Sequence, residues 1–210
     1  NKKITLPNNV KVTSIKVLQK DSSENNNLKA GAIYVGTTNG VYFKSYNEND
    51  NNNIMNYKFD GLDFPITNIE LDNKGSAYVI NNKGEVYHLD LNGFGNKKIT
   101  LPNNVKVTSI KVLQKDSSEN NNLKAGAIYV GTTNGVYFKS YNENDNNNIM
   151  NYKFDGLDFP ITNIELDNKG SAYVINNKGE VYHLDLNGFG NKKITLPNNV
   201  KVTSIKVLQK

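Results

Sequence analysis

Short runs of β-branched and aromatic residues recur along the chain, and Gly, Asn and Asp separate them. Apolar and polar positions alternate within several runs, which is the pattern of half-buried β-strands. No segment shows the helical period. In the first 101 residues the predicted strands are 12–18, 32–36, 41–46, 54–59, 66–71, 77–80, 85–91 and 97–101. The pattern therefore predicts an all-β protein.

The chain also repeats itself with a period of 95 residues. Residues 96–190 reproduce residues 1–95 without a substitution, and residues 191–210 reproduce residues 1–20. Residues 1–210 are therefore predicted to form a single repeat array. Any site of the first copy must recur in the second, which makes the array multivalent.

A weaker repetition lies inside each 95-residue unit, because residues 12–17 resemble 66–71 and residues 31–35 resemble 75–79. Each half of the unit holds four predicted strands. Turns at 38–40 and 82–84 join the second strand to the third, and their Asn and Gly residues tolerate the positive φ of a tight hairpin. Four-stranded repeats of about 40 to 50 residues are typical of β-propellers. We predict a β-propeller of four-stranded antiparallel blades, with two blades in each repeat.

The two ends of the chain do not match this plan. The chain begins with a fourth-type strand at 2–6 and finishes with a first-type strand at 202–208, and both lack the middle pair of a blade. A blade cannot bury both faces alone, so the ring must close. Three arrangements fit: a four-bladed ring with redundant ends, a ring completed by another chain, or a window from a longer array. We favour the third, since the chain stops where earlier copies enter a polar loop.

The net charge of +5 does not indicate a nucleic-acid partner. Residues 1–95 contain ten Lys and ten acidic residues, residues 96–190 repeat that balance, and the excess comes from five Lys in the last 20 residues. Arginine is absent, and no basic stripe runs along the chain. No apolar stretch approaches the roughly 20 residues that span a membrane, so membrane insertion is not expected. Cysteine is absent, which excludes disulfides and thiolate metal sites.

The segment Gly-Ala-Ile-Tyr-Val-Gly-Thr-Thr-Asn-Gly-Val-Tyr at 31–42 resembles the blade signature of the two-component-regulator type of propeller repeat. The second blade departs from the signature, because Ile80-Asn81 stands in place of Gly36-Thr37. The resemblance implies a propeller that senses or binds a ligand. In blade size and repetitiveness the chain is also similar to tachylectin-type lectins and to surface adhesins. That similarity implies an extracellular or cell-surface location.

One loop, at residues 59–65, combines two carboxylates with two aromatic rings. Aromatic rings suit the apolar face of a sugar, and carboxylates accept hydrogen bonds from its hydroxyl groups. The alternative is that the rings pack between blades while the carboxylates cap a turn. The candidate ligand-binding residues are Asp60, Asp63, Phe64, Asn81 and Asn82, with their copies Asp155, Asp158, Phe159, Asn176 and Asn177.

Catalytic and metal-binding patterns are weak. His88 shares a strand face with Asp90, but no Ser or Cys nucleophile motif accompanies it, so we interpret the pair as a half-exposed cross-strand contact. Asp60 and Asp63 lie too close in one loop to flank a sugar as glycosidase carboxylates do. The polar loops 21–28 and 47–53 lie on the opposite rim, and we interpret them as solvated connections without Ca²⁺-binding spacing. No catalytic residue, metal or cofactor is predicted.

The sequence is compatible with two functions. The first is a non-enzymatic, multivalent binding propeller of lectin or adhesin character that recognises glycans or surface ligands. The second is an assembly scaffold, a surface or filament protein, in which the unmatched strands 2–6 and 202–208 join successive chains or repeats by strand addition. An enzymatic role is not expected.

Overall fold

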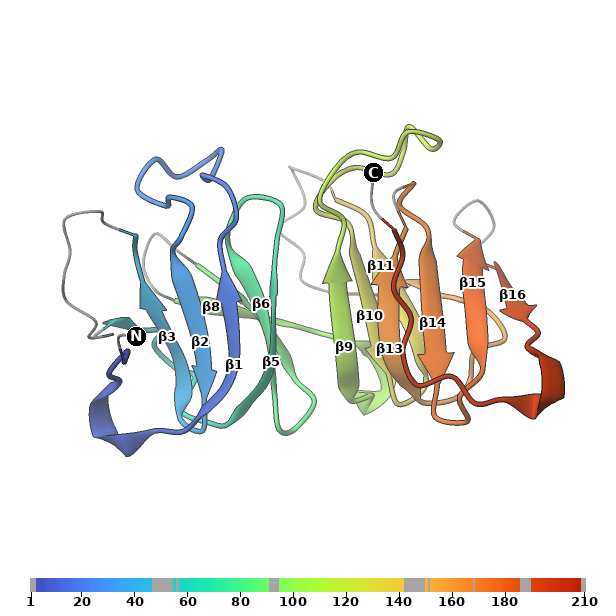
Figure 1. Ribbon diagram of the computed structural model, residues 1–210, viewed down its shortest axis with the longest axis horizontal. Helices are drawn as coiled ribbons and strands as arrows, with labels where there is room; N and C mark the ends of the chain where they lie inside the picture. Colours follow the sequence, from blue (N-terminus) through green and yellow to red (C-terminus); the bar gives the residue numbers. More distant parts are fainter. Residues whose placement is uncertain are drawn as a thin grey trace. The chain divides into compact units, whose positions relative to one another are not determined.

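Sixteen β-strands and three short 3-10 helices make up the described part of the chain (Figure 1). In this computed structural model the described residues are 3–46, 55, 57–90, 95–141, 150, 152–167, 169–185 and 190–208. The strands form four antiparallel sheets of four strands each, and within each sheet the strands lie in chain order. The predicted all-β class and the four-stranded blades are therefore confirmed.

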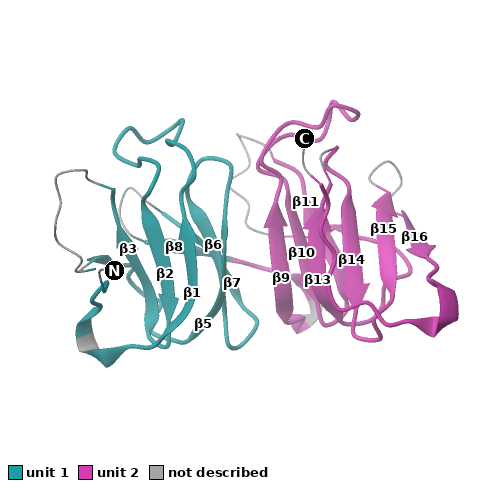
Figure 2. Ribbon diagram, viewed as in Figure 1, with its two compact units in different colours: residues 1–98 teal, residues 99–210 magenta. Residues whose placement is uncertain are grey.

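The chain divides into two compact units, residues 1–98 and 99–210 (Figure 2). In unit 1 the first sheet contains β1 (Val12–Val17), β2 (Ile33–Thr37), β3 (Gly40–Lys44) and β4 (Tyr57–Lys58), and the second contains β5 (Ile66–Leu71), β6 (Ala77–Asn81), β7 (Val86–Leu89) and β8 (Asn96–Ile99). The strand β8 comes from the start of the second repeat yet completes a sheet that begins in the first. A structural boundary therefore falls a few residues after the sequence repeat.

Unit 2 repeats this arrangement. Its first sheet contains β9 (Val107–Val112), β10 (Ile128–Thr132), β11 (Gly135–Lys139) and β12 (Tyr152–Lys153), and its second contains β13 (Ile161–Leu166), β14 (Ala172–Asn176), β15 (Val181–Asp185) and β16 (Gly190–Ile194). The 3-10 helices, Pro7–Asn9, Pro102–Asn104 and Pro197–Asn199, each precede the position of a first-type strand. Most predicted strands agree with these bounds to within a residue or two. The predicted strand 54–59 is shorter, because β4 holds only Tyr57–Lys58 among the described residues.

The two unmatched strands predicted from the sequence are not found, so that prediction was wrong. Among the described residues 3–6, only Thr5 forms an isolated bridge, and its carbonyl accepts a 2.9 Å hydrogen bond from the backbone of Met55. Described residues 201–208 contain no assigned strand. Each segment lacks the middle pair of strands that would supply a regular ladder of hydrogen bonds.

The core of each unit lies between its two sheets. In unit 1, Tyr34 of the first sheet and Phe59, directly after β4, are buried in one cluster with Ile66 and Ile69 of the second sheet. A Cβ added at Gly36 would lie 2.8 Å from Ile66 Cγ2, so glycine permits the two sheets to approach closely. Unit 2 has the equivalent cluster. The apolar faces that neither blade can shield alone are therefore covered by pairing blades.

Candidate functional site

The predicted binding residues lie along one rim of each unit. The backbone of Phe64 accepts a 3.0 Å hydrogen bond from Gly40, and that of Pro65 accepts one of the same length from Asn82. The loop 59–65 therefore lies against the hairpin turns of both blades.

The side chains of this rim make internal contacts. Asp63 forms an ion pair with Lys58, and the ring of Phe64 lies 5.4 Å from the ring of Tyr87. Asn81 is buried, and its Oδ1 accepts hydrogen bonds from the backbone of residues 83 and 85 at 3.0 and 2.9 Å. Asp60 is exposed, and its carbonyl accepts a 2.6 Å bond from Asn96.

Of these residues, Asn81 has the turn role and Phe64 the packing role considered for them, whereas the contact of the Asp63 carboxylate is an ion pair and that of Asp60 is made by its backbone. In the second repeat, the equivalent contacts are made by Asp158 with Lys153, Phe159 with Tyr182, Asn176 with the 178–180 turn, Asn177 with Pro160, and Asp155 with Asn191. No contact of this rim tests ligand binding, which stays a prediction for these residues.

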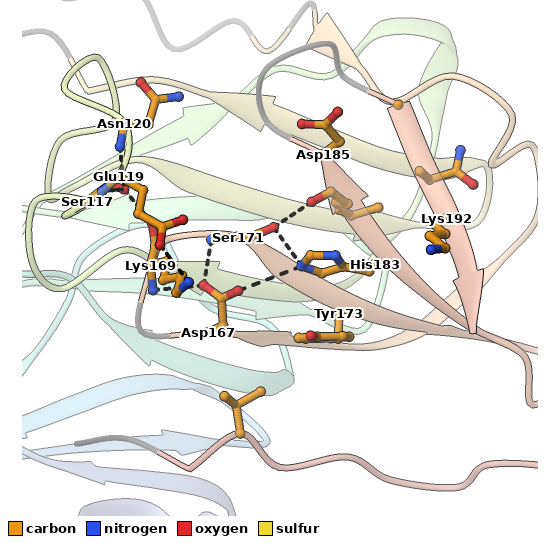
Figure 3. Close-up of a pocket in the computed structure, with 14 residues that line it drawn as sticks. Ser117, Glu119, Asn120, Asp167, Lys169, Ser171, Tyr173, His183, Asp185 and Lys192 are labelled. Carbon is orange, nitrogen blue, oxygen red and sulfur yellow. Dashed lines mark hydrogen bonds and ion pairs between the residues drawn. The ribbon is translucent and has the colours of Figure 1, made fainter. Parts of the chain in front are cut away.

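A pocket of about 790 Å³ lies on the opposite rim of unit 2 (Figure 3). The connection after β9, the turn between β13 and β14, and the ends of β15 and β16 form its walls, and residue 207 adds an apolar contact. Its polar lining residues are Ser117, Glu119, Asn120, Asp167, Lys169, Ser171, Tyr173, His183, Asp185, Asn191 and Lys192. A volume of this size lies within the range of small-molecule sites.

Asp167, Tyr173 and His183 form the centre of this pocket (Figure 3). The His183 ring stacks on Tyr173 with centroids 4.5 Å apart and planes 25° from parallel. Asp167 Oδ2 lies 3.7 Å from His183 Nε2, while its Oδ1 accepts backbone hydrogen bonds from Lys169 and Ser171 at 2.9 and 2.8 Å. The turn between β13 and β14 therefore fixes the carboxylate beside an aromatic pair.

The first repeat has the same central group. Tyr78 stacks on His88 with centroids 4.2 Å apart, and Asp72 Oδ2 lies 3.0 Å from His88 Nε2. The acid that pairs with the histidine is Asp72, from the turn after β5, and not Asp90 on the same strand. From the sequence we interpreted His88 as paired with Asp90. The structure does place an acid beside His88, but that acid is Asp72.

The loop that follows β9 carries a second charged pair into the pocket (Figure 3). Lys169 Nζ lies 2.6 Å from Glu119 Oε1, and this hydrogen bond raises the pKa of Lys169. Ser117 positions the loop, because its hydroxyl donates to the carbonyl of Lys169 and accepts from the backbone of Glu119 and Asn120. The long polar loop is thus tied to the neighbouring blade, although most of its side chains are exposed, as expected for a solvated connection. The other loop interpreted in this way, 47–53, lies outside the described residues.

The serine in this pocket is not arranged as an activated nucleophile. Ser171 Oγ lies 3.1 Å from His183 Nε2, the same ring nitrogen that faces Asp167. In a Ser-His-Asp triad, the serine and the acid contact different ring nitrogens. Ser171 instead donates to the carbonyl of Leu184. The arrangement offers hydrogen-bond partners and a stacking surface, which suits binding more than proton transfer.

Sequence reasoning missed this pocket because its parts are far apart in the chain. Glu119, Asp167 and His183 belong to three different connections or strands. A recurring Asp-Asn-Lys-Gly-Ser turn at 72–76 and 167–171 was the available signal. Within the described residues, no group of three or more His, Asp or Glu side chains is placed to hold a metal ion. In the same part of the chain, no helix is long and apolar enough to cross a membrane.

Comparison with known proteins supports the fold. No protein-family model and no curated protein match the sequence. A solved Dos1 propeller is similar in structure, with a TM-score of 0.55 and 13% identity over 85% of this chain and 52% of that one. The extracellular domain of BT4673 from B. thetaiotaomicron, described as a one-component system, has a TM-score of 0.59 and 13% identity over 88% of this chain and 25% of that one.

The chain therefore spans about half of one solved chain and a quarter of the other. Likeness at this identity establishes architecture and leaves activity open. The four-stranded sheets, the order of their strands and the two structural neighbours all support the same fold. The chain is a β-propeller repeat protein.

Proposed function

We propose that this chain is a non-enzymatic, multivalent binding propeller whose ligand occupies the pocket around His183. The observation that carries the proposal is the grouping of Asp167, Tyr173 and His183 in a pocket of about 790 Å³. The same three residue types recur as Asp72, Tyr78 and His88, where Tyr78 is buried, and binding at both copies would raise the apparent affinity.

A glycan is the ligand class that this lining favours. An aromatic ring packs against the apolar face of a sugar, while carboxylates, amides and lysines bond its hydroxyl groups. Asp167, Asn120 and Lys192 supply these groups around Tyr173. An extracellular or cell-surface location is consistent with this ligand, and one structural neighbour is an extracellular domain.

A glycan array tests the proposal with two matched variants. We expect His88→Ala with His183→Ala to reduce binding at least about tenfold, a loss of about 1.4 kcal/mol. Asp60→Ala with Asp155→Ala changes the opposite rim and should leave binding unchanged. Loss of binding only in the second variant would move the site to the rim predicted from the sequence. If no glycan binds the intact chain, the lectin-like proposal fails.

An assembly scaffold is the second candidate, since the exact repeat gives successive units the same surfaces. Sedimentation of the intact chain over a range of concentrations tests this function. A concentration-dependent rise in mass supports assembly, and a strict monomer that binds glycans supports the first function alone.

A further inference from the structure

The histidine of each central group is a ring that a ligand can reach. His88 stacks on Tyr78, and His183 stacks on Tyr173. The side chains of the two histidines are 34 and 39% exposed, whereas Tyr78 is buried and Tyr173 is half-buried. The hydrogen-bonding state of the imidazole therefore decides which chemical group this part of the site accepts.

The neighbours of Nε2 in His183 both accept hydrogen bonds (Figure 3). Ser171 Oγ lies 3.1 Å from Nε2, and the hydroxyl of Ser171 donates to the carbonyl of Leu184. A carbonyl only accepts, so the single hydroxyl proton of Ser171 is used there and its oxygen can only accept from Nε2. Asp167 Oδ2, at 3.7 Å, belongs to a carboxylate, which is also an acceptor. The proton of the ring therefore lies on Nε2.

The first repeat leads to the same assignment through a different partner. Asp72 Oδ2 lies 3.0 Å from His88 Nε2, and Asp72 Oδ1 accepts two backbone hydrogen bonds at 2.9 and 2.8 Å, which hold the carboxylate in place. The hydroxyl of Ser76 donates to the carbonyl of Leu89 at 2.6 Å. An ionised carboxylate only accepts, so Nε2 of His88 must donate.

The second ring nitrogen, Nδ1, is left as an acceptor in both copies. A neutral imidazole carries one N–H, and its other nitrogen presents a lone pair. Among the described residues, no donor is bonded to Nδ1 of His88 or His183. A ligand that supplies a donor at this position gains a hydrogen bond that the chain itself does not make.

We propose that Nδ1 of His88 and of His183 accepts a hydrogen bond from a hydroxyl group of the ligand, so that the site selects a glycan with a free hydroxyl at this position. Asp72 and Ser171 act as positioning residues, because they fix the proton on Nε2. An ether oxygen at the same position has no proton to donate. This inference rests on the binding function proposed above and names the chemical group that the site recognises.

A glycan array with modified ligands tests the contact. Each glycan that binds the full chain is compared with derivatives in which one hydroxyl is replaced by hydrogen or by a methoxy group. We expect both changes at one position to weaken binding to the natural chain at least about tenfold. His88→Phe with His183→Phe keeps an aromatic ring on each tyrosine and removes the nitrogens. In this variant the same two changes should have little further effect.

An equal effect of the hydroxyl in the natural chain and in the phenylalanine variant would overturn the contact while leaving glycan binding intact. Circular dichroism should show that the variant keeps its β structure. Nuclear magnetic resonance of the natural chain gives a measurement that needs no variant. Addition of the bound glycan should shift the Nδ1 signal more than the Nε2 signal, and an unchanged Nδ1 signal on binding would also overturn the contact.

The tautomer can be measured without a ligand. The chain has two histidines, so isotope-labelled histidine gives two sets of ring signals, recorded at about pH 8 to keep the rings neutral. We expect the proton on Nε2 in both rings. A proton on Nδ1 in either ring would overturn the assignment even if glycans bind. If the proton lies on Nε2 but no glycan binds the intact chain, the binding function fails, and hydroxyl recognition fails with it.

Discussion

The hydroxyl of Tyr34 donates a 2.6 Å hydrogen bond to the carbonyl of Gly75, and so links the two sheets of unit 1. Tyr129 makes the same bond to Gly170 in unit 2. Burial, and then the negative charge of Asp72, raise the pKa of Tyr34, which keeps the phenol protonated as a donor. The bond holds the glycine turn that also positions the Asp72 carboxylate beside His88.

Removing this hydroxyl should destabilise the protein. Tyr34→Phe leaves the Gly75 carbonyl without its buried donor, and we expect a loss of about 1 to 2 kcal/mol in the free energy of unfolding. Urea denaturation measures the change. Tyr57→Phe is the control, because Tyr57 is largely exposed and should have little effect. An equal loss in both variants would show that the buried bond is not what stabilises the pair of sheets.

The hairpin turn of the first blade should not accept a side chain. Gly40 has a φ of +98°, and a Cβ there would lie 2.5 Å from the carbonyl oxygen of Leu62. Gly40→Ala should therefore cost about 1 to 3 kcal/mol in the free energy of unfolding. Gly95→Ala meets nothing within 4 Å and should be close to neutral. Equal melting temperatures for the two variants would contradict this account of the turn.

A buried serine in the second repeat should be better replaced by alanine. Ser109 Oγ is buried and has no hydrogen-bond partner among the described residues. We expect Ser109→Ala to raise the free energy of unfolding by about 1 kcal/mol, because an unpaired hydroxyl is costly to bury. Ser14 is the same residue in the first repeat but is partly exposed, so Ser14→Ala should change little. Destabilisation by Ser109→Ala would indicate that the hydroxyl has a partner.

Acid should weaken the attachment of strand β8. The hydrogen bond from Lys98, and then that from Asn81, lower the pKa of Glu85 below its ordinary value of 4.5. A lowered folded-state pKa means that the carboxylate stabilises the fold above about pH 4.5, and that this contribution is lost as the pH falls through the lower value. Glu85→Gln should flatten this part of the stability profile, measured by urea denaturation between about pH 3 and about pH 7.

The matched control for this titration is Glu24→Gln. Glu24 forms an ion pair with Lys74 outside the strand contact. This substitution removes one carboxylate elsewhere in unit 1 and keeps the contact between Glu85 and Lys98, so it gives the reference profile for the comparison. An unchanged limb in Glu85→Gln would show that the pair with Lys98 does not contribute to the acid sensitivity.

The sequence by itself determined the strands and the blades. Alternating apolar positions and the Asn-Gly turn before Val41 are local signals, because strand periodicity and positive φ depend on neighbouring residues. The exact repeat then determined that any site occurs twice. These features needed no knowledge of which residues meet across the fold.

The tertiary structure decided where the candidate site lies and which copies are covered. Asp167 and His183 belong to different strands, and sheet pairing alone brings them together beside the loop that holds Glu119. It also decided that Ile15 is exposed while Ile110 is buried, although their surroundings in sequence are identical. Burial depends on the tertiary surroundings of a side chain, and a repeated sequence reads the same in each of its copies.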